Sequence, residues 1–423
     1  MSRRGGPRRG MGIALAGGGP LGGIYEIGAL VALQEALDGV EFTDLDVYVG
    51  VSSGAFFAAG LANGLSPREM HAMFILDRSH HDPFEPELLL RPAFKEFARR
   101  LQQAPSLLKS AGLSYLGRGR GSGFIESFLR LTRGLPTGLF DNEPIALYLR
   151  KLFNKAGRTD DFRKLPHKLF IVAADLDSGK AAPFGGPGLD HVPISEAVKA
   201  SSALPGLYPP AHIGGRDYVD GALRKTLHAS VALKEGAKLL ICVNPIVPYN
   251  SDLAAQRKGG AGVRLAEGGL LSVLSQSFRA LIHSRLHVGI ERYAREFPDA
   301  DVILFEPAQD DEVMFFTNVF SYSDRRELAE HAYRHTRDEL RRRADELEQI
   351  LARHGASLNR AVLEDPSRCL PKRGEFAPRG PLWESLKPLG GALKDLERAF
   401  AAQHKSGAEG RALNAAEEAA ADA

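Results

Sequence analysis

The sequence contains little cysteine and no long apolar run. Only Cys242 and Cys369 occur among its 423 residues. Two cysteines supply neither a disulfide framework nor a cysteine metal cluster, so the composition favours a reducing compartment. No stretch of about 20 apolar residues is available to span a bilayer. We therefore expect a cytoplasmic protein without a transmembrane helix.

An excess of charge of one sign is also missing. The 54 Lys and Arg residues nearly balance the 52 Asp and Glu residues, for a net charge of +2. A dedicated nucleic-acid binder would gather a strong basic excess on one face, so we expect no nucleic-acid partner. With 44% hydrophobic and 25% charged residues, the chain has a globular composition and room for one large or two smaller domains.

The chain starts with a basic segment, MSRRGGPRRG, that imitates the start of a secretory signal. The run that follows is interrupted by several glycines, Pro20 and Glu26, and it has no evident A-x-A cleavage site, so we reject that interpretation. Residues 1–10 cannot bury enough apolar surface to order themselves, and we expect them to be disordered. Their four arginines either stay solvated or attract anionic lipid head groups, giving a peripheral membrane contact.

Glycines fill the first predicted turn. Residues 11–16 predict a short buried strand and residues 22–37 a helix, and the segment where they meet reads GGGPLGG. The spacing fits a dinucleotide-binding loop, but the next strand does not end in an acidic residue, and the Gly-Lys-Ser/Thr of a Walker loop is missing. A structural turn and an oxyanion hole remain, because Gly17, Gly18 and Gly19 would let backbone N–H groups approach a developing alkoxide.

The segment LDVYVGVSSGAFFAAGL, residues 45–61, predicts a buried strand that runs directly into a helix. Its G-x-S-x-G turn places Ser52 at a sharp corner where the hydroxyl projects outward. The amino terminus of the following helix would favour negative charge beside this serine. The pentapeptide alone is weak, since chance matches are common. Together with the glycine loop one strand earlier, it favours an oxyanion hole and a nucleophilic Ser52.

The pattern along the chain predicts an α/β fold with a largely parallel central sheet, because apolar strands alternate with helices from Met11 to Val243. Asp220-Gly221 follows one short strand and, taken alone, is most often only a turn. Residues 324–354 predict one long charged helix with an apolar stripe. We expect a main domain at 11–320 with an inserted helical cap at about 63–136, a helical carboxy-terminal extension at 321–402 and a disordered tail at 403–423.

Three motifs in this order resemble the patatin-like phospholipases, a family of serine acyl hydrolases. They are GGGPLG at 17–22, GVSSG at 50–54 and DGA at 220–222, and GLFD at 138–141 and ASSALPGLYPP at 200–210 are also similar to the family. The resemblance covers residues 11–245. It implies a patatin-like three-layer fold and hydrolysis of phospholipid or lysophospholipid esters, without a cofactor or metal.

The resemblance also implies site residues. Ser52 and Asp220 would form a catalytic dyad, and Gly17, Gly18 and Gly19 would surround the oxyanion. The sequence departs from the family pattern in two places. Leu21 stands where Arg or Lys is common, and Arg224 and Lys225 are among the residues that replace the usual Asn and Pro after the DGA motif.

Two other interpretations remain open. An α/β-hydrolase-type esterase would use a Ser-Asp-His triad, and His283 or His287 would follow Ser52 and Asp220 in a permitted order. Alternatively, the chain is a weakly active lipid-binding or scaffolding protein, which the departures from the family pattern favour. Measurable turnover of a lipid ester would separate an enzyme from a scaffold.

Overall fold

A computed structural model describes residues 10–76, 84, 89, 91–93, 137–258, 264–316 and 322–370 of the chain. Residues 1–370 fall into one compact unit. The expected amino-terminal tail up to residue 9, most of the expected cap, and the part of the chain after residue 370 lie outside the described residues.

The described core is built on an eight-stranded sheet. Five of its strands lie parallel in the order β4-β3-β1-β8-β9, with β7 and then β6 continuing the sheet antiparallel beyond β4, and β5 also pairing with β4. The strands are β1 (Met11–Leu15), β3 (Val47–Gly50), β4 (Lys168–Asp175), β5 (Ala181–Phe184), β6 (Ala211–Ile213), β7 (Arg216–Asp220), β8 (Leu239–Val243) and β9 (Asp301–Phe305). The expectation of a largely parallel sheet is confirmed, and the carboxyl ends of the parallel strands meet at one edge.

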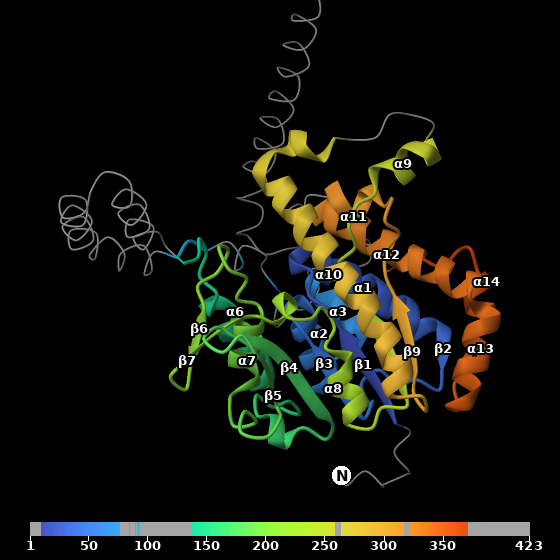
Figure 1. Cartoon of the computed structure of the whole chain (residues 1–423). Helices are drawn as coiled ribbons and strands as arrows, with labels where there is room; N and C mark the ends of the chain where they lie inside the picture. Colours follow the sequence, from blue (N-terminus) through green and yellow to red (C-terminus); the bar gives the residue numbers. More distant parts are fainter. Residues whose placement is uncertain are drawn as a thin grey trace, which may run out of the picture. The chain divides into compact units, whose positions relative to one another are not determined.

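Side chains that alternate along the strands enter two separate cores. Ile13 and Leu15 of β1 belong to one core, and Ala14 between them belongs to the other. The first core is covered by α1 (Gly19–Ala36), α2 (Ser53–Ala62), α3 (Pro67–Phe74), α6 (Glu143–Phe153), α7 (Ile194–Ser201) and α12 (Tyr322–Arg342). The second is covered by α8 (Ala229–Lys234) and α10 (Gly269–Glu296), which Figure 1 shows on the opposite face of the sheet. The fold therefore has the three layers expected.

Helix α12 packs closely against α1, although it belongs to the expected carboxy-terminal extension. A Cβ on Gly28 of α1 would lie only 2.2 Å from the carbonyl oxygen of Ala329, so only glycine permits this approach. Leu328, Ala332 and Tyr333 of α12 are fully buried in the main core. Residues 322–370 are therefore part of the body of the protein.

The expectation of a single helix at 324–354 is wrong, because this segment divides at Arg343 into α12 and α13 (Ala344–Arg353). The Arg343 guanidinium donates to the carbonyl oxygen of Leu304 in β9, at 3.0 Å, and to the Glu339 carboxylate, at 2.8 Å. Anchoring of this side chain to the sheet is a tertiary contact that helical periodicity does not reveal.

The remaining elements connect this framework. Helix α3 lies in the segment assigned to the cap, yet its Met70 and Met73 are buried in the main core. The others are β2 (Leu37–Asp38), β10 (Ser357–Leu358), α9 (Ser251–Lys258), α11 (Glu312–Phe316), α14 (Arg360–Glu364) and the 3-10 turns Phe162–Lys164, Gly221–Leu223 and Leu265–Gly268. Across the described ranges, none of the helices combines the length and apolarity needed to cross a bilayer.

Candidate active site

Ser52 occupies the corner between β3 and α2. Its backbone has φ 52° and ψ −121°, a strained conformation for a residue with a side chain, and α2 begins at the next residue. The flanking glycines allow the sharp turn: a Cβ on Gly50 would lie 2.5 Å from the Cα of Ala55, and one on Gly54 would lie 2.4 Å from the carbonyl oxygen of Leu15. Both motif glycines are therefore required by close backbone contacts.

Two serines at the end of α7 hold this corner in place. The Ser52 amide donates to the Ser201 hydroxyl at 2.9 Å, and that hydroxyl donates to the carbonyl oxygen of Val172 in β4 at 2.7 Å. The Ser202 hydroxyl donates to the Ser52 carbonyl at 3.4 Å. Ser201 is fully buried, so its two hydrogen bonds connect the strained turn to the sheet without competition from water.

The glycine loop between β1 and α1 lies against Ser52. A Cβ on Gly17 would lie 2.9 Å from the Cβ of Ser52 and 3.2 Å from the Cβ of Ala222, so both residues pack closely against this glycine. Among the described residues, the amide hydrogens of Gly17, Gly18 and Gly19 have no acceptor. Because α1 begins at Gly19, these unpaired donors lie at the positive end of a helix.

Asp220 is the last residue of β7. Its carboxylate accepts a hydrogen bond from the amide of Ala222 at 2.9 Å, and the Ser52 side chain lies close enough to influence its pKa. The side chain of Asp220 is 2% exposed. Burial raises the pKa of Asp220 to about 6, although the Ser52 hydroxyl and the Ala222 amide lower it. A carboxylate of this pKa is ionised at neutral pH and is a stronger base than an exposed aspartate.

The amino-terminal half of the chain matches a known family model. The model of patatin-like phospholipases matches residues 13–233, which include the glycine loop, the Ser52 corner and Asp220. The chain belongs to the patatin-like phospholipase family.

Individual relatives are more distant. An uncharacterized NTE family protein of Mycobacterium tuberculosis is 28% identical over 246 residues, which are 56% of this chain and 30% of that protein. The chain thus spans about a third of the length of this curated relative. Among solved structures, VipD from Legionella pneumophila covers 59% of this chain and 52% of its own, at 18% identity and a TM-score of 0.31. The type III effector protein ExoU covers 80% and 54%, at 16% identity and a TM-score of 0.32. Neither TM-score is high enough to bear on function.

The histidines considered for a triad make their contacts elsewhere. His283 and His287 of α10 contact Glu306, at 3.2 and 3.4 Å. His212 pairs with Asp217 at 2.9 Å on the exposed β6-β7 hairpin. None of these partners belongs to the Ser52 corner.

His228 lies nearer, but in a supporting position. Burial lowers its pKa to about 4, so the ring is neutral at pH 7. Its Nε2 lies 3.3 Å from the carbonyl oxygen of Gly221, the residue after Asp220. A Cβ on Gly221 would lie 2.1 Å from the Val172 carbonyl oxygen, so the Asp-Gly turn is pressed onto β4. His228 therefore supports the turn that carries Asp220.

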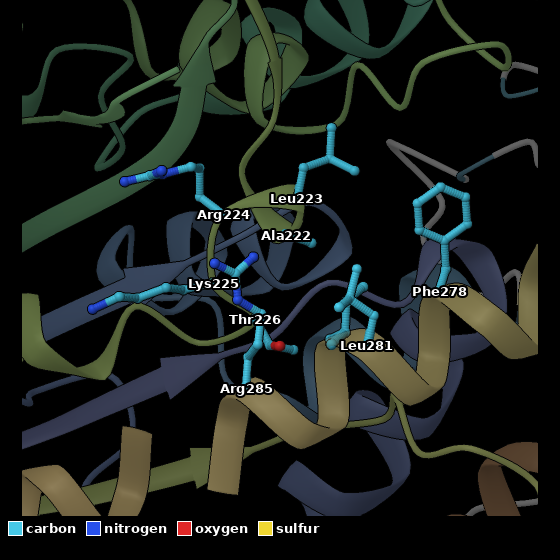
Figure 2. Close-up of a pocket in the computed structure, with 9 residues that line it drawn as sticks. Ala222, Leu223, Arg224, Lys225, Thr226, Phe278, Leu281 and Arg285 are labelled. Atoms are coloured by element: carbon cyan, nitrogen blue, oxygen red, sulfur yellow. The ribbon is translucent and has the colours of Figure 1, made fainter. Parts of the chain in front are cut away.

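A groove begins two residues after Asp220 and is closed on one side by α10. The groove is lined by Ala222, Leu223, Arg224, Lys225, Thr226, Phe278, Leu281, Ile282 and Arg285. Figure 2 shows its apolar side chains Leu223, Phe278 and Leu281 on the side away from Arg224 and Lys225. The two departures from the family pattern at Arg224 and Lys225 thus line the groove. Leu21 packs against the main core.

Sequence reasoning missed two parts of this site. Ser201 lies in a stretch that resembles the family, but nothing in the local pattern shows that its hydroxyl would hold the Ser52 amide 149 positions away. The residues of α10 that line the groove come from a helix outside the family match. The sequence of α10 gives no local signal for Phe278 and Leu281, which are about half exposed in the structure.

Proposed function

We propose that the protein hydrolyses carboxylic esters of phospholipids or lysophospholipids through a Ser52–Asp220 dyad and an acyl-enzyme. The observation that carries this proposal is the position of the Ser52 side chain beside a buried Asp220 carboxylate, whose pKa it lowers. Unpaired amide donors of the glycine loop lie beside the same serine. Nucleophile, base and donors for an oxyanion therefore converge at one edge of the sheet.

Acylation would begin when the Ser52 hydroxyl attacks the ester carbonyl carbon. Asp220 accepts the hydroxyl proton, and the carbonyl oxygen becomes a negatively charged tetrahedral oxyanion. The amides of Gly17, Gly18 and Gly19 would stabilise that charge, since they have no other acceptor among the described residues. The intermediate then expels the alcohol, which takes the proton from Asp220.

Deacylation would reverse these roles with water. Asp220 removes a proton from a water molecule that attacks the Ser52 ester, and the same amides stabilise the second oxyanion. Collapse of this intermediate releases the fatty acid and returns the proton to Ser52. The raised pKa of Asp220 assists both steps, because a base with a pKa of about 6 accepts a proton more readily than an ordinary aspartate.

The groove beside Asp220 supports a phospholipid-like substrate. Its wall combines apolar side chains, among them Leu223, Phe278 and Leu281, with the cations Arg224, Lys225 and Arg285. An acyl chain gains from burial against the first group, and a phosphate from charge-assisted hydrogen bonds to the second. Ala222 connects this groove to Gly17 and hence to Ser52.

Helix α10 supports a peripheral contact with lipid aggregates. Leu270, Leu274, Phe278 and Leu281 are between 44% and 73% exposed and recur at helical spacing, so they form one apolar stripe that ends at the groove. A stripe of this kind inserts into a membrane interface. Leu274→Glu should weaken co-sedimentation with anionic vesicles. Leu147→Glu, which changes a similarly exposed leucine on α6, is the control and should bind like wild type. Equal binding by wild type and both variants would contradict this contact.

The catalytic proposal is tested with a fluorophosphonate probe and a panel of phospholipid and lysophospholipid esters. Wild type should be labelled at Ser52 and should release fatty acid. Ser52→Ala should be folded, unlabelled and inactive. Ser53→Ala is the matched control, because it removes the neighbouring hydroxyl and should leave labelling intact. Labelling that persists in Ser52→Ala, or a wild type without turnover on any ester, would overturn the proposal.

A further inference from the structure

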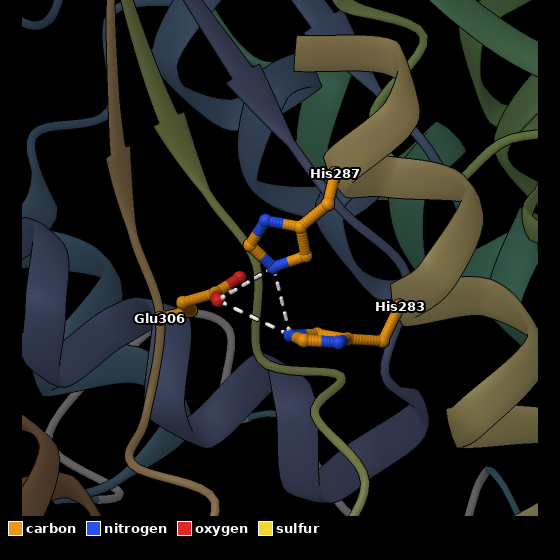
Figure 3. A group of neighbouring side chains, drawn as sticks. All are labelled: His283, His287 and Glu306. Carbon is orange, nitrogen blue, oxygen red and sulfur yellow. Dashed lines mark hydrogen bonds and ion pairs between the residues drawn. The ribbon is translucent and has the colours of Figure 1, made fainter. Parts of the chain in front are cut away.

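Three potential metal ligands meet between α10 and the end of β9. His283 and His287 lie one turn apart on α10, and Glu306 directly follows β9 (Figure 3). The two Nε2 atoms are 3.0 Å apart, and the Oε1 atom of Glu306 lies 3.2 Å from His283 and 3.4 Å from His287. These atoms form a nearly equilateral triangle, and none of these residues belongs to the Ser52 site.

Two separate hydrogen bonds do not satisfy this triangle, and without a metal a single N–H would have to be shared between the other two atoms. If both Nε2 atoms carry hydrogens and donate to Glu306, the two N–H groups oppose each other at 3.0 Å. If His287 donates to His283 instead, the lone pair of His283 accepts that bond, and its Nε2 then has no hydrogen for the carboxylate 3.2 Å away. A cation at the centre of the three atoms satisfies all of them at once, because each atom then offers a lone pair to it.

The size of the triangle fits a divalent first-row metal such as zinc. Zn²⁺ binds imidazole nitrogen and carboxylate oxygen at about 2.0–2.2 Å, which places tetrahedral ligand atoms about 3.3–3.5 Å apart. The observed separations of 3.0, 3.2 and 3.4 Å need only small side-chain adjustments to reach this spacing. We propose that His283, His287 and Glu306 form a zinc site, with a water molecule as the fourth ligand on the half-exposed side of His287.

A second layer of contacts orients the carboxylate. Asn244 at the end of β8 is fully buried, and its Nδ2 donates to the other oxygen of Glu306, Oε2, at 3.2 Å. This bond leaves Oε1 directed at the two histidines. Supporting hydrogen bonds of this type are usual around protein metal sites.

Zinc would fasten α10 to the sheet. Most of this helix is exposed. Among its described residues, the buried apolar side chains are Leu286 and Tyr293. Both lie toward its carboxyl end, whereas Phe278 and Leu281 at the groove lie toward its amino end. A metal bound at His283 would anchor the helix next to the groove-lining turn. The site does not depend on the proposed hydrolase activity.

The direct test is calorimetric titration of chelator-treated full-length protein with zinc chloride. We expect saturable binding of one zinc ion per chain, and a loss of affinity of at least about tenfold in His287→Ala and in Glu306→Gln. His287 is half exposed, so its replacement should leave the fold intact. The control is His212→Ala, which removes another histidine paired with a carboxylate, His212 with Asp217 at 2.9 Å, but without a third ligand.

Hydrogen exchange provides a readout that is independent of affinity. Zinc should slow exchange of the α10 amides around His283 in wild type and in His212→Ala, and should have no such effect in His287→Ala. The proposal is overturned if wild type shows no saturable zinc binding, if His287→Ala binds zinc as tightly as wild type, or if His212→Ala loses as much affinity as His287→Ala.

Discussion

Replacing Asp220 with asparagine should abolish hydrolysis and, at the same time, stabilise the protein at neutral pH. The carboxyl group is 2% exposed, and burial raises its pKa from 3.8 to about 6. A shift of this size means that ionised Asp220 lowers the free energy of unfolding by about 3 kcal/mol. Asparagine does not ionise, and its Oδ1 can still accept the hydrogen bond from Ala222.

The sign of the effect sets its pH dependence. Because the folded-state pKa lies above the unfolded value of 3.8, the penalty is absent below about pH 3.8. It grows as the pH rises and is complete above about pH 6. The Asp220→Asn protein should therefore resist urea better than wild type at pH 7, with the difference shrinking toward pH 4.

Activity should move in the opposite direction. Without a base to accept the Ser52 proton, kcat/KM of Asp220→Asn should fall by at least about 10³-fold, and the double variant with Ser52→Ala should be little worse. In wild type, only about a tenth of Asp220 is ionised at pH 5 if its pKa is about 6, so kcat/KM should be about tenfold lower there than at its plateau.

These expectations are checked with one soluble ester assayed between pH 4.5 and 8, together with urea unfolding at pH 4 and pH 7. Circular dichroism at each pH confirms that the protein is folded. Three results would refute the reasoning: substantial turnover by Asp220→Asn, lower stability of that variant at pH 7, or a wild-type rate that is unchanged between pH 5 and pH 7.

Three further predictions concern the glycine loop, the support of the Ser52 corner and a buried carboxyl group of α1. Gly17→Ala should reduce kcat by roughly 100-fold, because the new Cβ would lie 2.9 Å from the Cβ of Ser52. Gly289→Ala is the control and should be fully active, because its Cβ would have ordinary contacts at 3.7 Å. Equal activity of the two variants would contradict the close approach of Gly17 to Ser52. Ser201→Ala removes the acceptor of the Ser52 amide, so it should lower the free energy of unfolding by about 1–3 kcal/mol and also lower kcat/KM. Unchanged stability in urea would argue against a role of Ser201 in holding the Ser52 corner. Glu26→Met should stabilise the protein at pH 7, because burial raises the pKa of this carboxyl group and neither of its oxygens has a partner among the described residues. That gain should shrink toward pH 4, where the unfolded chain also protonates Glu26, and a loss of stability at pH 7 would contradict it.

The sequence determined the parts of this protein that depend on local backbone geometry. A glycine loop before a helix and the G-x-S-x-G corner are required by contacts within two neighbouring strand-helix units, as at Gly50 and Gly54. The alternation of apolar strands with helices likewise predicts a parallel sheet, because each helix must return the chain across the sheet. Family membership followed from these motifs and their order.

Tertiary structure decided which distant residues meet. Asp220 faces Ser52 only because β7 pairs with β4 in a particular register, with Asp220 opposite Ala173, and its raised pKa comes from burial that no local pattern encodes. Ser201 contacts the Ser52 amide because its hydroxyl is held by the carbonyl oxygen of Val172 in β4. These contacts join residues that lie 149 or more positions apart, and a change of register between β7 and β4 would move Asp220 away from Ser52.

The placement of α10 was also beyond the sequence. Phe278 reaches the groove and His283 reaches Glu306 only because the helix lies on the surface that β8 and β9 form. Local sequence determines backbone conformation through sterics over a few residues. The charge, burial and partners of a side chain depend on packing against segments that the chain reaches much later, and these were decided by the tertiary structure alone.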